Sequence, residues 1–477
     1  MSGAHAGAQA PFKDRATAAL ADKTLKIAID RTTGNAERKR AAAVAAFPEF
    51  EAARARGKAI KDHVIAHLDH YLEQFERNAT ASGAKVHWAV DDAGARAIVT
   101  RICLEAKAKL VTRSKSMLGE EIGLPHALAD AGIERVETDL AEHIIQLAGE
   151  KPSHIVWPAM HRTREQVAEL FKTGHRPPPA AEDPATMVQS ARRELRTKFL
   201  SADIGISGAN FLVADTGATC TVTNEGNAEL TTTPPRIHIV TAGIEKIVPS
   251  TVHAFALLRL LVRSATGGEL TQYTTFHCGP KRPGDADGPE EMHIVLVDNG
   301  RTRMLADEFR EMLRCIRCGA CMNHCVVYRQ IGGHAYGGTY PGPMGSVLTP
   351  VLDGLAGSRD LPNACTMNGR CAEVCPVGIP LPTLLRAWRI RSWREKLEPG
   401  ALRVGISLWA MLAKRPALYR LASRTGVRAI RMFGKAGWIS RLPLAGGWTA
   451  HRDMPRPKGR TFMEQYRAEQ AKKGGRP

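Results

Sequence analysis

The sequence reads CIRCGACMNHC at residues 315–325, which is four cysteines in the spacing C-x2-C-x2-C-x3-C. Three thiolates at this spacing let the chain wrap around one iron–sulfur cubane, and the fourth cysteine of such a run binds the other cluster of a pair. Zinc sites instead typically use C-x2-C pairs that are separated by a dozen or more residues. The stretch therefore predicts ligands for a pair of iron–sulfur clusters.

A second stretch, CTMNGRCAEVCP at residues 365–376, repeats this frame but has Asn368 where the second cysteine would stand. The cross-ligation rule then assigns the thiolates to two iron–sulfur clusters. The predicted ligands are Cys315, Cys318, Cys321 and Cys375 for the first cluster, and Cys325, Cys365 and Cys371 for the second. The second cluster therefore lacks one protein thiolate.

Asn368 leaves three outcomes open for the second cluster: a [3Fe–4S] centre, a [4Fe–4S] centre capped by asparagine or water, or a fourth thiolate from elsewhere in the chain. An amide oxygen is a harder and weaker ligand for iron than a thiolate. We favour an intact [4Fe–4S] cluster that loses its unprotected iron in air. The remaining cysteines, Cys103, Cys220 and Cys278, are expected to be small buried apolar residues.

Residues 69–300, which precede the cysteine region, alternate short β-branched runs with segments of helical spacing. This alternation is typical of an α/β domain with a parallel sheet covered by helices. Predicted strands are 86–90, 110–113, 133–137, 155–158, 236–243 and 292–298 with a hairpin at 210–224, and predicted helices are 117–131, 140–149 and 164–172. The sheet carries no dinucleotide or P-loop fingerprint, so we expect neither NAD nor ATP as a cofactor.

The remaining boundaries follow from composition. Residues 1–68 are rich in Ala, Lys and Arg and read as a helical segment that is peripheral to the chemistry. The domain that holds the clustered cysteines spans 301–385, and a basic helical C-terminal region spans 386–477. This last region holds 22 Lys and Arg against 5 Asp and Glu, and five of the seven tryptophans of the chain.

Basic side chains interleaved with indoles suit an anionic membrane surface or an acidic partner. The alternative is a basic tail that packs its tryptophans on its own protein. We find no nucleic-acid reading module, so no nucleic-acid partner is expected. The chain has no apolar run of membrane-spanning length and no export signal, and clustered thiols suit a reducing compartment. We expect a cytoplasmic protein, with peripheral membrane contact through the basic region.

Beyond its cysteines, the chain resembles the LutB/LldF-type iron–sulfur proteins of L-lactate utilisation over nearly its whole length. The resemblance rests on KSM at 115–117, EEI at 120–122, ETDL at 137–140, PSHI at 152–155, GANF at 208–211, TNEGN at 223–227, GIEK at 243–246 and GGHAYG at 332–337. Val326 departs from the family, in which proline often follows the fourth cysteine. The resemblance implies a LUD domain, whose fold is similar to ribose-5-phosphate isomerase and CoA transferases (NagB/RpiA-like), followed by a helical two-cluster ferredoxin-type domain.

The resemblance further implies oxidation of L-lactate to pyruvate in a complex with two companions, a CCG-module protein and a second LUD protein. Our leading hypothesis is an electron-transfer subunit. One alternative is a catalytic subunit that binds the hydroxy acid in the LUD domain, with Asn224 and Glu225 as candidate residues at the end of a predicted strand. Glu225 could act as a base or could simply be solvated. A third reading is a non-enzymatic scaffold that its clusters stabilise.

Overall fold

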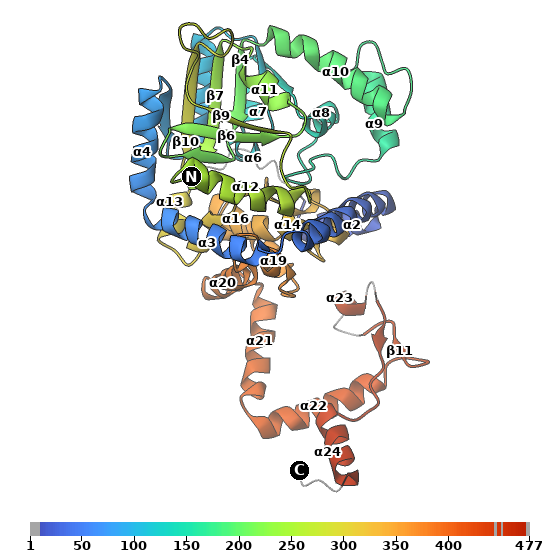
Figure 1. The fold of residues 1–477 in the computed structure, drawn as a ribbon. Coiled ribbons are helices and arrows are strands. Elements are labelled where there is room, and N and C mark those ends of the chain that lie inside the picture. Colours follow the sequence, from blue (N-terminus) through green and yellow to red (C-terminus); the bar gives the residue numbers. More distant parts are fainter. Residues whose placement is uncertain (1–9, 443–445, 450–451, 474–477) are drawn as a thin grey trace. The chain divides into compact units, whose positions relative to one another are not determined.

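In the computed structural model of the protein, the chain forms two compact units. The first unit ends at Glu395, and the second begins at Lys396. The structure describes residues 10–442, 446–449 and 452–473. Both sheets of the α/β domain and both cysteine stretches lie in the first unit (Figure 1). The α/β fold class and the helical cysteine-rich domain are confirmed.

A six-stranded parallel sheet forms the centre of the α/β domain. Its strands follow the order β1-β10-β7-β4-β2-β3, and every neighbouring pair is parallel. The bounds are β1 Lys85–Ala89, β2 Leu110–Arg113, β3 Glu134–Glu137, β4 Ile204–Gly208, β7 Ile237–Gly243 and β10 Glu291–Val297.

Helices cover both faces of this sheet (Figure 1). The bounds of the helices of the α/β domain are α4 Leu68–Ala81, α5 Asp92–Glu105, α6 Met117–Glu121, α7 Leu124–Asp130, α8 Leu140–Leu147, α9 Arg164–Gly174, α10 Pro184–Ser201, α11 Asn227–Thr232, α12 Thr251–Ala265 and α13 Arg301–Leu305. Alternate residues of the central strands enter different cores: Ile239 packs with α5 and α7, whereas Val240 packs with α4. Burial on both faces explains why these strands read as continuous apolar runs.

A second, four-stranded sheet contains the predicted hairpin. Its order is β8-β5-β6-β9, with bounds β5 Phe211–Val213, β6 Ala218–Thr223, β8 Ile247–Val248 and β9 Tyr273–His277. The prediction had not identified β4, β8 or β9. The sequence also predicted a single helix at 117–131. The structure has two helices there, α6 and α7, which are separated at Gly123 with a φ angle of 68°.

The predicted strand at 155–158 is wrong, since this segment is an irregular loop. The loop uses its peptide groups locally: the imidazole Nδ1 of His154 accepts hydrogen bonds from the backbone N–H groups of Val156 and Trp157 at 3.0 and 3.1 Å. The ammonium group of Lys115 donates to the carbonyl of Val156 at 2.6 Å. Those groups are therefore not available to a sheet ladder.

The cysteine domain is built from short helices. Their bounds are η2 Arg310–Arg314, α14 Ala320–Asn323, α15 Tyr328–Ile331, η3 His334–Tyr336, α16 Gly342–Leu352, α17 Leu355–Ser358, α18 Asp360–Asn363, α19 Arg370–Glu373 and α20 Leu381–Arg394. The indole of Trp388 in α20 is buried, stacks on Phe309 at 3.9 Å between ring centroids, and donates to the carbonyl of Val347. The first residues of the basic region therefore pack on this domain.

The N-terminal helices contact the cysteine stretches, so the expectation that they are peripheral is wrong. Their bounds are α1 Phe12–Ala21, α2 Lys23–Ala45 and α3 Phe50–Ala66. Arg40 of α2 donates to the carbonyl of Val374 at 3.0 Å, and Arg54 of α3 donates to that of Cys375 at 2.8 Å. These two helices thus hold the second cysteine stretch in place.

The GGHAYG stretch packs closely against the irregular loop of the α/β domain. A Cβ atom at Gly333 would lie 1.8 Å from the carbonyl oxygen of Ser153, so only glycine permits this approach. The imidazole Nε2 of His334 lies 2.7 Å from the carbonyl oxygen of Lys151. The α/β domain and the cysteine domain are thereby joined into one compact unit.

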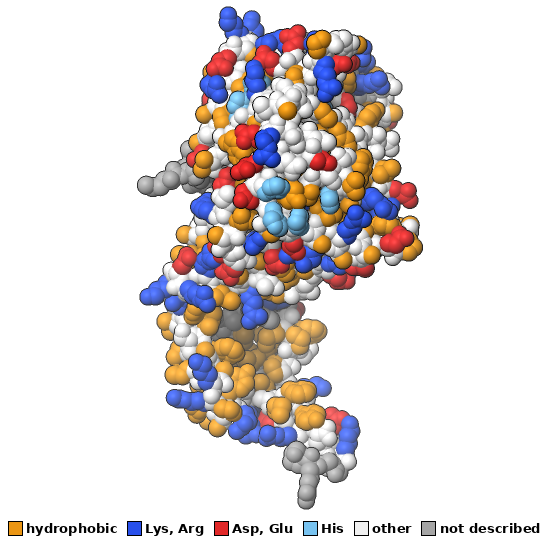
Figure 2. Space-filling view, turned by 60° about the vertical axis from the view of Figure 1, so that its left-hand side comes forward, with side chains coloured by type: hydrophobic (Ala, Val, Ile, Leu, Met, Phe, Trp, Pro, Cys, Tyr) orange, Lys and Arg blue, Asp and Glu red, His pale blue; other side chains and the backbone are white. Residues whose placement is uncertain are grey.

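The second unit is mainly helical. Its elements are α21 Gly400–Ala413, α22 Pro416–Arg431, β11 Trp438–Ile439, α23 Gly446–Thr449, β12 Met454–Pro455 and α24 Phe462–Lys472. No described residue of α21 or α22 is buried. Apolar and basic side chains both lie on the surface of these helices (Figure 2).

Candidate functional site

The thiols of the first predicted set lie within electrostatic reach of one another. Burial raises the pKa of Cys318 to about 12, and the charges of Cys375 and Cys315 add to the rise. Burial likewise raises the pKa of Cys321 far above its usual value, and the charges of Cys318 and Cys315, followed by those of Cys371 and Cys375, add to the rise. Cys375, from the second stretch, thus lies beside cysteines of the first.

The thiols of the second predicted set are grouped in the same way. Burial raises the pKa of Cys371 to about 12, followed by the charges of Cys365 and Cys325. Cys325 is partly buried, and its thiol pairs with the hydroxyl of Tyr336. Such buried thiols would bind iron as thiolates, which a cluster's positive iron stabilises.

Backbone amides point at several of these sulfur atoms. The N–H groups of Met367, Ile379 and Tyr328 donate to the thiols of Cys365, Cys375 and Cys325 at 3.3, 3.3 and 3.5 Å. Hydrogen bonds to sulfur are among the features that set the reduction potential of a cluster. The chemistry of this donor set therefore fits iron–sulfur clusters.

Among the described residues, no three His, Cys, Asp or Glu side chains are grouped so as to hold a metal ion. This finding is compatible with the grouping of the thiols, because each thiolate of a cluster binds its own iron atom.

The two cysteine stretches have the same backbone form. Arg317 and Met367 both adopt positive φ angles, 61° and 60°, and the glycines that follow two residues later, Gly319 and Gly369, have φ angles of 74° and 84°. Each glycine precedes a single helical turn, α14 or α19. By this internal repeat, Asn368 occupies the position of Cys318.

Asn368 also makes the hydrogen bond of the cysteine that it replaces. Its side-chain oxygen accepts from the backbone N–H of Arg370 at 3.3 Å, and the thiol of Cys318 accepts from the equivalent N–H of Ala320. Asn368 itself is exposed. The position without a cysteine therefore lies at the protein surface.

The other three cysteines lie in the α/β domain. Cys103 and Cys220 are buried as expected, and burial raises the pKa of each thiol to about 12. Cys278 is exposed, so the expectation of burial is wrong for this residue. It follows β9 directly, at the edge of the smaller sheet.

A cavity of about 310 Å³ lies at the carboxyl edge of the parallel sheet. The segments that follow β2, β4 and β7 form one side of it, and Arg317 and Tyr340 of the cysteine domain form another. Open α/β sheets bind their ligands at this edge. None of the seven predicted cluster ligands lines the cavity, but Arg317 stands between Cys315 and Cys318.

A buried network of charges forms one wall of this cavity. The guanidinium of Arg301 donates to both carboxylate oxygens of Glu121 at 2.9 and 3.0 Å, and its Nε contacts Glu245. The hydroxyl of Tyr340 donates to Glu121 at 2.6 Å. Burial alone would raise the pKa of Glu245, but Arg301 and Arg317 hold it at about 2. The carboxylates of Glu121 and Glu245 are therefore charged and already paired with arginine side chains.

Arg317 and Lys246 are two cations of the cavity that have unused donors. Arg317 reaches Glu245 only at 3.4 Å, and its Nη1 is buried without a hydrogen-bond partner. Among the described residues, no hydrogen-bond partner is found for the ammonium group of Lys246 either. Burial lowers the pKa of Lys246 to about 8, and the charge of Arg317 contributes to the decrease.

Both candidate residues of the catalytic hypothesis line the same cavity, but each already has a backbone partner. The side-chain oxygen of Asn224 accepts from the N–H of Gln272 at 3.0 Å, and Glu225 accepts from that of Leu140, also at 3.0 Å. Burial raises the pKa of Glu225, and the charge of Asp139 adds to the rise. The prediction missed Arg317 and Lys246 as cavity residues, although GIEK and the first cysteine stretch contain them.

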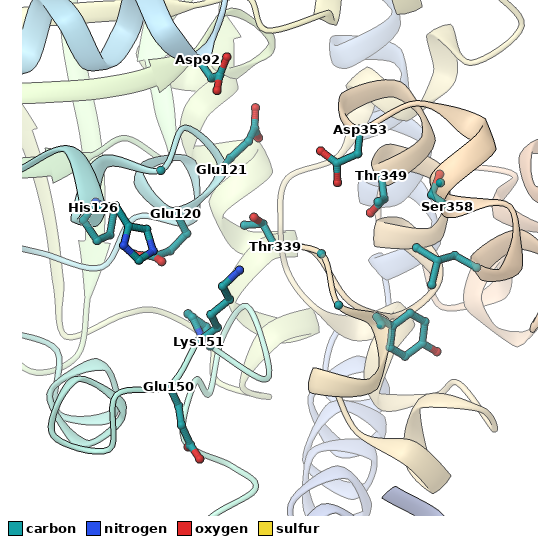
Figure 3. A pocket seen from close by; sticks show the side chains of 18 of the residues that line it. Asp92, Glu120, Glu121, His126, Glu150, Lys151, Thr339, Thr349, Asp353 and Ser358 are labelled. Carbon is teal, nitrogen blue, oxygen red and sulfur yellow. The ribbon is translucent and has the colours of Figure 1, made fainter. Parts of the chain in front are cut away.

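A larger cavity of about 1450 Å³ separates another part of the α/β domain from the cysteine domain. Figure 3 shows Glu121 and Asp353 approaching it from opposite sides, with the amine of Lys151 pointing into the space. Nine carboxylates and five cationic side chains line this cavity. Burial and the charge of Glu121 raise the pKa of Asp353. The excess of carboxylates lining this larger cavity disfavours an anionic ligand.

Three family models match successive parts of the chain. They are a LUD domain at residues 72–297, a 4Fe-4S dicluster domain at 311–379, and the C-terminal region of lactate utilisation protein B at 381–471. Together with the fold and the grouped thiols, these matches define an iron–sulfur protein in which a LUD domain is joined to a dicluster domain.

Curated relatives match almost the whole chain. An uncharacterized electron transport protein, YkgF of Escherichia coli, is 41% identical over 97% of this chain and 98% of its own. Lactate utilization protein B 1 of Bacillus mycoides is 41% identical over 96% and 95%, and lactate utilization protein B of Bacillus licheniformis is 40% identical over 97% and 98%. The chain belongs to the lactate utilization protein B family, which confirms the family identified from the sequence.

Proposed function

We propose that this chain is the iron–sulfur electron-transfer subunit of a complex that oxidises L-lactate to pyruvate. The observation that carries the proposal is the arrangement of seven buried or half-buried thiols in two mutually interacting sets within a dicluster domain. The names of the relatives, which refer to lactate utilization and electron transport, support the substrate and the role.

The two thiol sets would hold two clusters. The first set, with four thiolates, suits a [4Fe–4S] cluster, and the second, with three, suits a [4Fe–4S] cluster with one iron that has no cysteine ligand. Bound clusters would supply one-electron acceptor sites, and oxidation of lactate to pyruvate releases two electrons. The companion subunits are a CCG-module protein and a second LUD protein, and a reducing cytoplasm is the proposed location.

The test uses the chain purified without oxygen, with its iron, and the two companion proteins. L-lactate is expected to bleach the iron–sulfur absorbance when all three proteins are present, with pyruvate formed in proportion to the electrons accepted. Omitting any one protein tells which subunits the reaction needs. Iron-replete clusters that stay oxidised in the full mixture would refute the proposal.

A second candidate function is catalysis within this chain. The cavity at the sheet edge favours it, because that cavity reaches the loop between Cys315 and Cys318. Bleaching by L-lactate with the purified chain alone would support this candidate over a pure electron carrier.

We also propose that residues 396–477 bind an anionic membrane surface. These residues hold 18 Lys and Arg against 4 Asp and Glu. Val404, Leu408 and Trp409 of α21 are 60%, 52% and 59% exposed, so apolar side chains are available beside the cations. The side chain of Trp448 lies outside the described part. Among the described residues, no helix has the length and apolar character needed to cross a bilayer.

We expect the full chain to sediment with vesicles that contain an anionic lipid at about 0.1 M salt and to be released at about 1 M, because the Debye length falls from about 10 to about 3 Å. Neutral vesicles should bind far less protein, and a chain truncated after Glu395 should bind neither. Truncation at that point keeps α20, whose Trp388 is buried. Equal binding by the truncated chain would contradict the proposal, and salt-sensitive binding to a companion subunit in place of vesicles would identify an acidic partner.

A further inference from the structure

Buried positive charge near the first cysteine stretch exceeds the negative charge that the protein supplies. Among the described residues, the carboxylates that act on Arg301, Arg317, Lys246 and Lys61 are those of Glu121 and Glu245. Lys61 is fully buried, and burial lowers its pKa to about 8. It donates to the backbone carbonyl of Glu245 rather than to a carboxylate. A buried charge without a counter-charge is costly, so an additional anion is expected in this region.

One source of negative charge is the first cluster with its four thiolates. It does not by itself explain why Arg317 and Lys246 both line the cavity, because none of the cluster cysteines does. Arg317 is also held in place, with its guanidinium 4.5 Å from the centre of the Tyr340 ring and its Nη2 near Glu245. Its Nη1 is left buried and unpartnered.

The rest of the lining limits what the anion can be. Ile155, Trp157, Leu261 and Val262 supply an apolar portion, and the hydroxyl of Ser114 is buried without a partner. The volume of about 310 Å³ is at the lower end for small-molecule sites. One cationic end, one apolar portion and a nearby hydroxyl fit a short monocarboxylate better than a dicarboxylate.

We infer that Arg317 and Lys246 form a carboxylate-binding site for a small 2-hydroxy or 2-oxo monocarboxylate, directly beside the loop that carries Cys315 and Cys318. The guanidinium offers donors of the geometry that carboxylates accept, and Lys246 adds a second cation from the opposite domain. The choice of L-lactate and pyruvate as probes rests on the proposed function. The site itself rests on the cavity and its unused donors.

The test is calorimetric titration of the iron-loaded chain, without companion proteins and without turnover, at constant ionic strength. L-lactate, pyruvate and propanoate are expected to bind, and malonate and inorganic phosphate to bind at least about tenfold more weakly. Lys246→Met and Arg317→Gln should each weaken L-lactate binding by about 10- to 100-fold, since each removes a hydrogen bond to a charged group. Lys246 is distant in sequence from the cysteines, so its replacement remains informative if Arg317→Gln assembles poorly.

Arg54→Gln is the matched control. Arg54 lies near the first thiol set, donating to the carbonyl of Cys375, but does not line the cavity. It should change the potential of the cluster while leaving L-lactate binding unchanged. The EPR spectrum of the reduced first cluster should change on addition of L-lactate in the wild type but not in Lys246→Met.

Absence of L-lactate, pyruvate and propanoate binding would overturn the site, and so would binding that neither cavity variant weakens. Equal affinity for phosphate would overturn the assignment of a carboxylate. These outcomes are separate from failure of the proposed function. If binding persists while lactate does not reduce the complete complex, the site stands and the electron-transfer proposal fails.

Discussion

Cys375→Ala is expected to remove the same cluster as Cys315→Ala, although the two residues belong to different stretches of the sequence. The structure places the thiols of Cys375, Cys315 and Cys318 within electrostatic reach of one another. Loss of one ligand would leave an iron atom of the first cluster without its thiolate. We expect about four of the roughly eight iron atoms per chain to be lost from either variant.

The measurement is the iron content and the EPR spectrum of each reduced variant, prepared without oxygen. Cys371→Ala should remove the signal of the other cluster and retain the one that Cys375→Ala loses. Cys278→Ala is the control, because this exposed cysteine lies outside both thiol sets and its replacement should leave all the iron in place. Identical spectra for Cys375→Ala and Cys371→Ala would show that each stretch binds its own cluster and would refute the cross-ligation assignment.

The sequence predicted best those features that depend on local spacing. The repeated cysteine frame fixes two equivalent wrapping loops, and the backbone confirms that equivalence down to the positive φ angles of Arg317 and Met367. The strands with strong β-branched runs were likewise located to within a residue or two, as at Leu110–Arg113. The fold class followed from these features, and the family from the short motifs between residues 115 and 337 together with the cysteine stretches.

The cavity could not be predicted in the same way, because its charges meet only in the folded chain. Arg301 contacts Glu121 and Glu245, which are 180 and 56 residues distant in the sequence. No spacing rule relates such residues. In the sequence, nothing distinguishes Arg317 from the other residues between the cysteines. Its buried Nη1 atom without a hydrogen-bond partner is evident only in the folded chain.

The incorrect strand at 155–158 has a related cause. Its first three residues are β-branched or aromatic, as in strands, but the side chains of His154 and Lys115 form hydrogen bonds with its peptide groups. Local propensity was outweighed by contacts that the pattern of apolar residues does not reveal.

The second cluster is expected to lose one iron atom in air, and Asn368→Cys is expected to prevent this loss. In the repeat, Asn368 stands where Cys318 stands and accepts the equivalent backbone hydrogen bond, from Arg370 at 3.3 Å. A cysteine at this position would therefore begin from the same backbone geometry as a ligand of the first cluster. Because the side chain is exposed, oxygen and water can reach the iron that lacks a thiolate.

Air-exposed wild type should show the EPR signal of an oxidised three-iron cluster, with iron content lowered by about one atom per chain. Asn368→Cys should slow this loss by about tenfold or more, since even residues that only orient metal ligands change affinity by 10- to 100-fold. Asn368→Ala shows whether the asparagine amide or a water molecule binds the iron that lacks a thiolate. Faster iron loss than in wild type indicates the amide, and an equal rate of iron loss indicates water.

The control variant is Asn363→Cys, which adds a thiol in α18 outside the repeat and should not protect the cluster. If wild type keeps all its iron in air and shows no three-iron signal, the second cluster must have a further strong ligand, and Tyr336, whose hydroxyl pairs with the thiol of Cys325, is the residue to replace next.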